Sequence, residues 1–201
     1  PYQLGFSPID WEIFTDFQIL KMMGVFDVEK MRSLLLMPPL FNENNKKLGR
    51  DMMFHAEQAG VLPDEQSGSR KDKSSNKLVL EKTLSFDIIR QQKIAATHTG
   101  LDASQCYDRM VHAPTGLSMI QHGGHEPAIR SMFEVLQNGE HKVATAYGVS
   151  TSTYGGRKRI KKGQHPIQAI GQGNGAGPAG FVMLSSTMIN VMRSKGFGAL
   201  Y

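Results

Sequence analysis

Alternating glycines between Ile170 and Pro178 constrain the local fold more than any other run in the chain. Glycine has no β-carbon, so such positions let the backbone approach a ligand or another segment closely and adopt positive φ angles. Pro178 suits the first turn of a helix, which we expect to continue to about Arg193. The run therefore predicts a tight loop that leads directly into a helix. The glycines concerned are Gly171, Gly173, Gly175 and Gly177.

A phosphate-binding loop of a nucleotide-binding protein is one alternative for this run. Counted from Gly171 or Gly173, the G-x-G-x-x-G pattern would require glycine at position 176 or 178, where the chain has alanine and proline, whereas counted from Gly175 the spacing is met by residues 175–180. No Gly-Lys-Ser or Gly-Lys-Thr is present either. The Gly-Lys-Ser/Thr pattern is excluded, the match of residues 175–180 to the other pattern is a weak signal by itself, and a plain flexible loop stays as the simpler alternative.

The second informative segment runs from Leu101 to Arg109. We expect a strand from Ile94 to Asp102 that presents the carboxylate of Asp102 at its end. Carboxylates at strand ends are natural ligands for magnesium, which prefers oxygen donors. Taken alone, an aspartate after a strand is more often a turn or cap residue, so the two interpretations stay open. Tyr107 follows Asp102 by five positions.

The remaining elements point to a mixed fold. Helices and strands occur without a regular β-α alternation, which favours an α+β class over a doubly wound sheet. An apolar stripe between Ser74 and Ile89 is most simply read as a core-facing helix. The other expected elements are a strand over Met31 to Met37, a helix capped by Asn42 and stopped at Gly60, helices near Pro114 and Pro127, a strand over Val143 to Val149, and a loop from about Ser150 to Gln164.

Charge and composition limit the partners. The net charge of +5 permits nucleic-acid binding without requiring it. Basic residues gather in two stretches, which are either solvated surface loops or phosphate contacts. No apolar run reaches the roughly 18–20 residues that cross a bilayer, so we expect no membrane partner. The stretches contain Arg70, Lys71, Lys73 and Lys77, and Arg157, Lys158, Arg159, Lys161 and Lys162.

Other chemistries find little support in the sequence. The histidines and the single cysteine lack the Cys-x-x-Cys or His-x₃-His spacing of a zinc site. A nucleophile elbow, Gly-x-Ser-x-Gly, is absent, which removes the usual basis for a hydrolase. Because Cys106 cannot form an internal disulfide, we expect an intracellular location, in cytoplasm or nucleus.

The two segments together resemble motifs A and B of reverse transcriptases. Asp102 with Tyr107 resembles motif A, and Gln172-Gly173 followed by Pro178 resembles motif B. The resemblance implies a right-hand polymerase architecture, with fingers-like residues 1–95 and a partial palm over residues 96–201. It implies template-directed DNA synthesis on RNA, with an RNA template, a DNA primer and deoxynucleoside triphosphates as partners.

The resemblance also implies roles for single residues. Asp102 would be the catalytic carboxylate and, with the carbonyl of Ala103, a ligand of magnesium, of which a complete enzyme holds two ions. Tyr107 would pack beneath the sugar and exclude a 2′-hydroxyl. Gln172 and Gly173 would lie near the templating base or primer.

Segments further upstream resemble the fingers motifs of the same family. Lys30 and Arg32 precede or begin a strand, where the family holds the incoming triphosphate, and a guanidinium suits phosphate oxygens. Lys21 is a weaker match of the same kind. The stretch from Glu65 to Ser74 resembles a template-contacting motif, which assigns Arg70, Lys71 and Lys73 to nucleic acid, together with Arg157, Lys158 and Arg159.

One expected motif does not occur before Tyr201, namely the aromatic-x-Asp-Asp hairpin that supplies the other metal ligands. The chain therefore resembles the front part of a polymerase, and we expect it to be inactive by itself. Two hypotheses follow. The first is a reverse transcriptase domain of a retroelement. The second is a catalytically dead remnant that acts only as a nucleic-acid-binding module.

Overall fold

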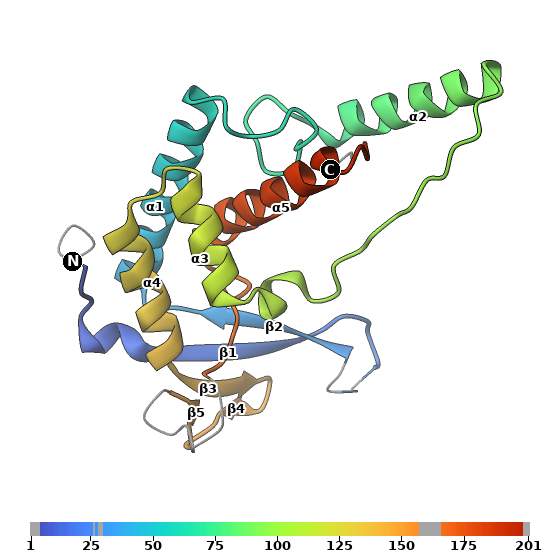
Figure 1. Cartoon of the computed structure of the whole chain (residues 1–201). Helices are drawn as coiled ribbons and strands as arrows, with labels where there is room; N and C mark the ends of the chain where they lie inside the picture. Colours follow the sequence, from blue (N-terminus) through green and yellow to red (C-terminus); the bar gives the residue numbers. More distant parts are fainter. Residues whose placement is uncertain (1–4, 26, 28–29, 157–165, 199–201) are drawn as a thin grey trace.

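A mixed sheet with α-helices gathered on one side of it forms the body of the protein in a computed structural model (Figure 1). The structure describes residues 5–25, 27, 30–156 and 166–198. Within these residues the fold is α+β, as the sequence predicts. No helix in this part of the chain is long and apolar enough to span a membrane.

The sheet has the strand order β2-β1-β3-β4, and β5 also pairs with β3. Strand β1 (Ile13–Leu20) is antiparallel to β2 (Met31–Leu36) and parallel to β3 (Glu140–Thr145). Strands β4 (Gly148–Val149) and β5 (Tyr154–Gly155) both run antiparallel to β3 and share its other edge. Both edges of β1 are therefore occupied.

The helices lie on one side of this sheet. They are α1 (Pro39–Gln58), α2 (Ser75–Gln91), α3 (His112–Gln121), α4 (Glu126–Asn138) and α5 (Gly177–Ser194), with short 3₁₀ helices at Ile9–Glu12 and Cys106–Arg109. Phe14 from β1 and Leu35 from β2 enter a common core with Phe41 of α1, Met132 of α4 and Met183 of α5. The alternation of β1 leaves its other side, including Ile13, exposed.

Local signals in the sequence correctly predict most helix starts. Ser74 is the N-cap of α2 and accepts a hydrogen bond from the backbone N–H of Lys77 at 3.3 Å. Pro127 and Pro178 lie in the first turns of α4 and α5. The strand expected over Met31 to Met37 is β2.

The strand expected from Ile94 to Asp102 does not form. Residues 94–103 have no regular secondary structure and are exposed. A strand needs a neighbour for its backbone groups, and both edges of β1 are taken by β2 and β3. The segment instead runs from the end of α2 back towards the body, as Figure 1 shows.

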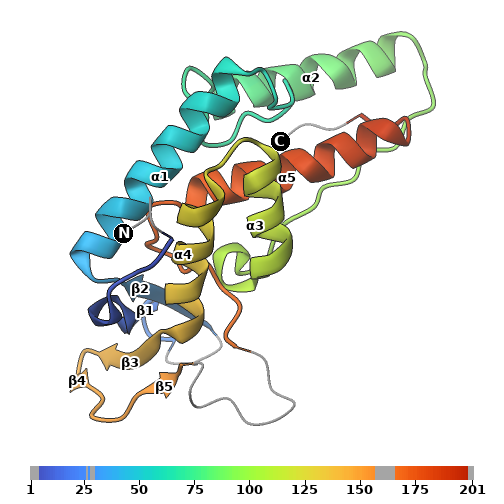
Figure 2. The same ribbon diagram turned by 60° about the vertical axis from the view of Figure 1, so that its left-hand side comes forward.

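Three further expectations need correction. Helix α2 has no buried residue, so its apolar stripe is not core; Figure 2 shows it at the end of the molecule away from the sheet. Helix α1 begins at Pro39, because proline suits the first helical position, so Asn42 is not its cap. The strand expected over Val143 to Val149 is divided between β3 and β4 by a turn.

Candidate nucleotide pocket and nucleic-acid groove

Three segments that are far apart in the sequence meet around one cavity of about 360 Å³. The hairpin of β1 and β2 contributes Arg32, the 3₁₀ helix contributes Tyr107, and the glycine loop contributes Gln172. These are three of the five residues for which the sequence predicts substrate binding. The other lining residues are Gln18, Lys21, Met31, Ser33, Gln105, Cys106 and Asp108.

Tyr107 is held in the cavity wall by the loop and by α5. Its carbonyl oxygen accepts a hydrogen bond from the N–H of Ile170 at 3.0 Å. Its ring packs on the start of α5, where a β-carbon at Gly177 would lie 3.3 Å from the ring. Burial raises the pKa of the Tyr107 hydroxyl, so it is neutral near pH 7. The half-buried ring therefore offers a fixed, uncharged surface.

Gln172 owes its place to the backbone of the loop. Its carbonyl accepts a hydrogen bond from the N–H of Leu35 at 2.8 Å, which joins the loop to β2. Gly171 and Gly173 flank it with φ angles of 80° and 122°, a region that favours glycine. The predicted positive φ angles are confirmed at these two positions. Gly175 instead allows close approach: a β-carbon there would lie 2.7 Å from the backbone nitrogen of Lys46.

One carboxylate lines the cavity and a second acts on it electrostatically, and the sequence gave neither of them a site role. Asp108 lines it, and its pKa is raised first by burial and then by the negative charge of Asp16. Asp16 is buried on β1 and accepts hydrogen bonds from Ser33 and, at 2.6 Å, from the hydroxyl of Tyr154. The available signal was a charged residue at an inward position of an otherwise apolar strand.

The predicted catalytic residue does not join this cavity. Asp102 and Ala103 are exposed in the irregular segment before the 3₁₀ helix and do not line it. Among the residues that the structure describes, no three His, Cys, Asp or Glu side chains gather closely enough to hold a metal ion. The described residues therefore do not by themselves form the two-magnesium site that the resemblance implies.

The other predicted substrate residues lie at the margins. Lys30 is exposed and pairs with Asp27 at 3.6 Å, and it does not line the cavity. Gly173 is exposed and does not line the cavity, and its carbonyl oxygen accepts a hydrogen bond from the side chain of Asn42 at 3.1 Å. Lys21, the weaker match in the sequence, does line the cavity.

Arg70 has a structural environment. Its guanidinium is 8% exposed, makes a bidentate contact with Glu57 and donates to the carbonyls of Pro63 and Gln66 at 2.7 and 3.0 Å. The hydrogen bond to Glu57 raises the pKa of Arg70 further, and the guanidinium stays charged. These contacts occupy most of the donors that a phosphate would need. Arg157, Lys158 and Arg159 lie outside the described residues.

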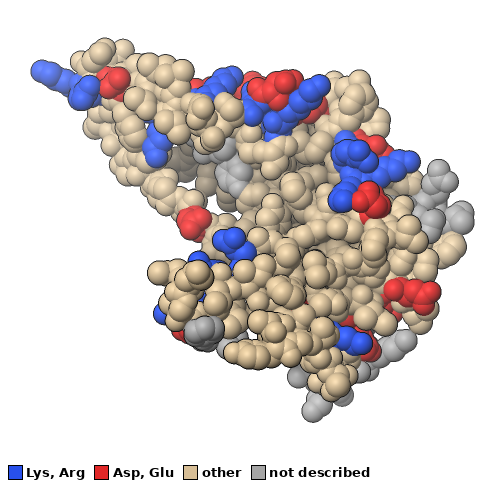
Figure 3. All heavy atoms as spheres, turned by 180° about the vertical axis from the view of Figure 1, so that it is seen from behind, with Lys and Arg blue, Asp and Glu red and all other residues tan. Residues whose placement is uncertain are grey.

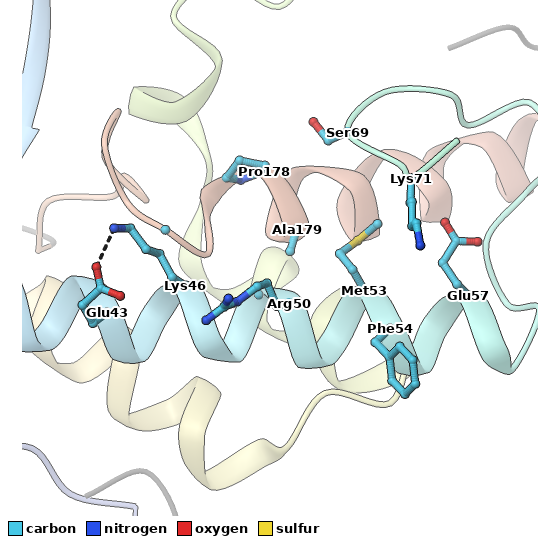
Figure 4. A pocket seen from close by; sticks show the side chains of 12 residues that line it. Glu43, Lys46, Arg50, Met53, Phe54, Glu57, Ser69, Lys71, Pro178 and Ala179 are labelled. Atoms are coloured by element: carbon cyan, nitrogen blue, oxygen red, sulfur yellow. Dashed lines mark hydrogen bonds and ion pairs between the residues drawn. The ribbon is translucent and has the colours of Figure 1, made fainter. Parts of the chain in front are cut away.

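A second hollow, of about 610 Å³, runs between α1 and the start of α5 (Figure 4). Lys46 and Arg50 rise from α1, and Lys71 approaches from the loop before α2. Met53 and Ala179 provide apolar surface between them. This α1–α5 groove contains one of the three described nucleic-acid candidates, Lys71; Lys73 is half-buried nearby in the chain and does not line the groove. Sequence reasoning missed Lys46 and Arg50, although an i, i+4 spacing places them on one helix face.

Acidic side chains moderate the charge of this groove. Lys46 pairs with Glu43 at 2.6 Å, and this hydrogen bond lowers the pKa of Glu43. Figure 3 shows the basic side chains of one face in several small groups with acidic ones close by, rather than in a continuous patch. The groove thus presents localised cations above an apolar floor.

No protein-family model matches the chain, and a comparison with curated proteins finds no match either.

Proposed function

We propose that this chain is part of a reverse transcriptase domain, which carries out template-directed DNA synthesis on RNA, and that the 360 Å³ cavity receives the deoxynucleoside triphosphate. The supporting observation is that Arg32, Tyr107 and Gln172 line one cavity. Motif resemblance assigned Arg32 and Tyr107 to the incoming nucleotide and Gln172 to the templating base or primer beside it, and the three come from segments about 70 to 140 positions apart. Such convergence is what a nucleotide site requires.

Each residue has a defined role in this proposal. The guanidinium of Arg32, exposed on β2, binds phosphate oxygens through paired donors. The ring of Tyr107 lies under the sugar and leaves no room for a 2′-hydroxyl. The amide of Gln172 hydrogen-bonds the base or the primer end. The roles of Asp102 and Ala103 as magnesium ligands rest on the motif resemblance alone. The further ligands that such a site needs are not provided by the described residues.

The template strand is assigned to the α1–α5 groove. Lys46, Arg50 and Lys71 would contact phosphate oxygens, while Met53 offers a surface for a base. Recognition of this kind reads the backbone and not the sequence, as a polymerase needs.

Nucleotide binding provides the direct test. A fluorescent deoxynucleotide titrated into the 201-residue chain should bind, and Arg32→Ala should weaken the binding by about 10- to 150-fold, since a charged hydrogen bond contributes about 1.5–3 kcal/mol. Arg130→Ala is the matched control, because Arg130 is an exposed arginine of α4 paired only with Glu126. Equal affinities for the three proteins, or no binding by any of them, would refute the nucleotide site.

A nucleic-acid-binding module without catalysis is the second candidate. Asp102 is exposed, and the described residues contain no cluster of metal-ligating side chains that it could complete, which favours this candidate. Binding to a primer–template should then weaken steeply with salt, and Lys71→Ala should reduce the slope of log affinity against log salt by about one unit. A salt-independent affinity would reject the phosphate contacts. Binding of primer–template without binding of deoxynucleotide would favour this module over the polymerase domain.

A further inference from the structure

Asn42 makes two hydrogen bonds with the backbone of the glycine loop. Its side-chain Nδ2 donates to the carbonyl of Gly173 at 3.1 Å, and its Oδ1 accepts from the N–H of Gly175 at 2.8 Å. The amide therefore pairs with one acceptor and one donor of the same loop. No other natural side chain of this length presents both groups in this arrangement.

The loop is held from the opposite side by β2. Leu35 donates its N–H to the carbonyl of Gln172, and a β-carbon at Gly173 would lie only 2.7 Å from the carbonyl oxygen of Leu35. The loop thus lies between the β2 strand and the first turns of α1. Contacts on both sides fix the segment that carries Gln172.

Internal contacts alone do not set this position. Asn174 stabilises the shape of the loop, since its side chain donates to the carbonyl of Ile170 at 3.0 Å and accepts from the N–H of Ala176 at 2.9 Å. These bonds stay within the loop and do not fix its distance from the cavity. Asn42 is a side chain of α1 that bonds directly to it from outside.

We propose that Asn42 is a positioning residue that sets the place of Gln172 in the nucleotide cavity; this rests on the proposed function. Asn42 does not line the cavity. It acts by holding the carbonyl of Gly173, the residue that follows Gln172, and the N–H of Gly175. A site whose groups are fixed before the ligand arrives loses less entropy on binding, so loosening the loop weakens the nucleotide without removing any direct contact.

Asn44 provides a matched control. It lies in the same turn of α1, is half-buried like Asn42, and donates through Nδ2 to the carbonyl of Leu40 at 2.8 Å. This bond stays inside α1 and does not reach the loop. Asn44→Ala therefore removes an equivalent amide from the same helix and leaves the loop contacts intact.

The experiment measures two quantities in Asn42→Ala and Asn44→Ala. These are the affinity for a fluorescent deoxynucleotide and the hydrogen exchange of the Gly175 amide. We expect Asn42→Ala to bind roughly tenfold more weakly and to exchange the amide faster, and Asn44→Ala to do neither. Asn42→Asp, nearly identical in shape, keeps the acceptor for Gly175 and loses the donor to Gly173. Asn42→Asp should retain slow exchange of the Gly175 amide and bind the deoxynucleotide with an affinity between those of the wild type and Asn42→Ala. It replaces the alanine variant in the experiment if that variant folds poorly.

A double-mutant cycle separates positioning from general stability. If Asn42 acts through Gln172, then Asn42→Ala should have little effect on affinity in a Gln172→Ala background. Additive losses would overturn the proposal, as would unchanged exchange of the Gly175 amide in Asn42→Ala. A wild-type chain that binds no nucleotide would refute the proposed function and with it the positioning role. Faster exchange of the Gly175 amide in Asn42→Ala would then show only that the two Asn42 hydrogen bonds hold the loop.

Discussion

His141 on β3 is a buried side chain whose polar atoms have no hydrogen-bond partner among the residues that the structure describes. The residue is 6% exposed, and neither ring nitrogen meets a donor or acceptor from this part of the chain. Its ring stacks on Tyr154 at a centroid distance of 5.1 Å and meets the edge of Phe14 at 5.2 Å. The polar imidazole therefore packs between two aromatic rings, an environment that suits an apolar ring better.

We expect His141→Phe to stabilise the protein. A buried polar group without a partner costs about 1–3 kcal/mol, and phenylalanine keeps both ring contacts. Because the phenyl ring is larger than imidazole, overpacking offsets part of the gain, and a net increase of about 1–2 kcal/mol in the free energy of unfolding is expected. For a chain of this size that corresponds to a rise in Tm of about 2–8 °C.

The substitution should also change the pH dependence of stability. Burial lowers the pKa of His141 in the folded state, and the nearby charge of Asp16 only partly opposes this. The unfolded chain then binds more protons, so stability falls as the pH drops through about 6.5, the pKa of an unperturbed histidine, towards the lower folded value. His141→Phe removes this contribution. Burial also lowers the pKa of His112, so the pH dependence that comes from His112 remains in the variant.

Urea unfolding between pH 5 and 8 measures both effects. His125→Gln serves as a control, because His125 is exposed before α4 and its side chain makes no capping hydrogen bond. A loss of stability in His141→Phe, or a pH profile that keeps its wild-type slope, would show that the ring nitrogens are satisfied in solution and refute the reasoning.

Two further substitutions should destabilise the fold. Gly175→Ala places a β-carbon 2.7 Å from the backbone nitrogen of Lys46, which cannot move without shifting α1, so a loss of about 2–3 kcal/mol is expected by urea unfolding; a loss under 0.5 kcal/mol would contradict it. Arg70→Met leaves Glu57 without its guanidinium partner and should cost about 2–3 kcal/mol. The control Arg90→Met removes an exposed pair and should cost under about 0.5 kcal/mol; equal losses for the two arginines would refute a special role for Arg70.

Helix starts were predictable because their signals are local. Ser74, Pro127 and Pro178 act through the first turn of their own helices, so no knowledge of the rest of the fold was needed. The strand proposed before Asp102 failed because a strand depends on a neighbour. Its apolar pattern fits extended backbone, but the edges of β1 are filled by segments that the pattern alone does not reveal.

The candidate site shows the same division between local and distant information. Motif spacing indicated Tyr107 and Gln172, and the structure brings them to one cavity. The basic stretch around Arg70 indicated surface charge, but the guanidinium is engaged by Glu57 on α1, a partner 13 positions earlier. Asp16 gave no motif at all. Its hydrogen-bond partner Tyr154 lies on β5, 138 positions later in the chain.

The parallel pairing of β1 with β3 has a consequence for synthesis of the chain. Strand β2 can pair with β1 soon after both emerge, but β3 follows β1 by roughly 120 residues, which takes about 6–25 s at typical translation rates of about 5–20 residues per second. During that interval one edge of an apolar hairpin stands open, and open edges recruit other strands. The nascent protein should therefore depend on chaperones until residues 140–145 have left the ribosome.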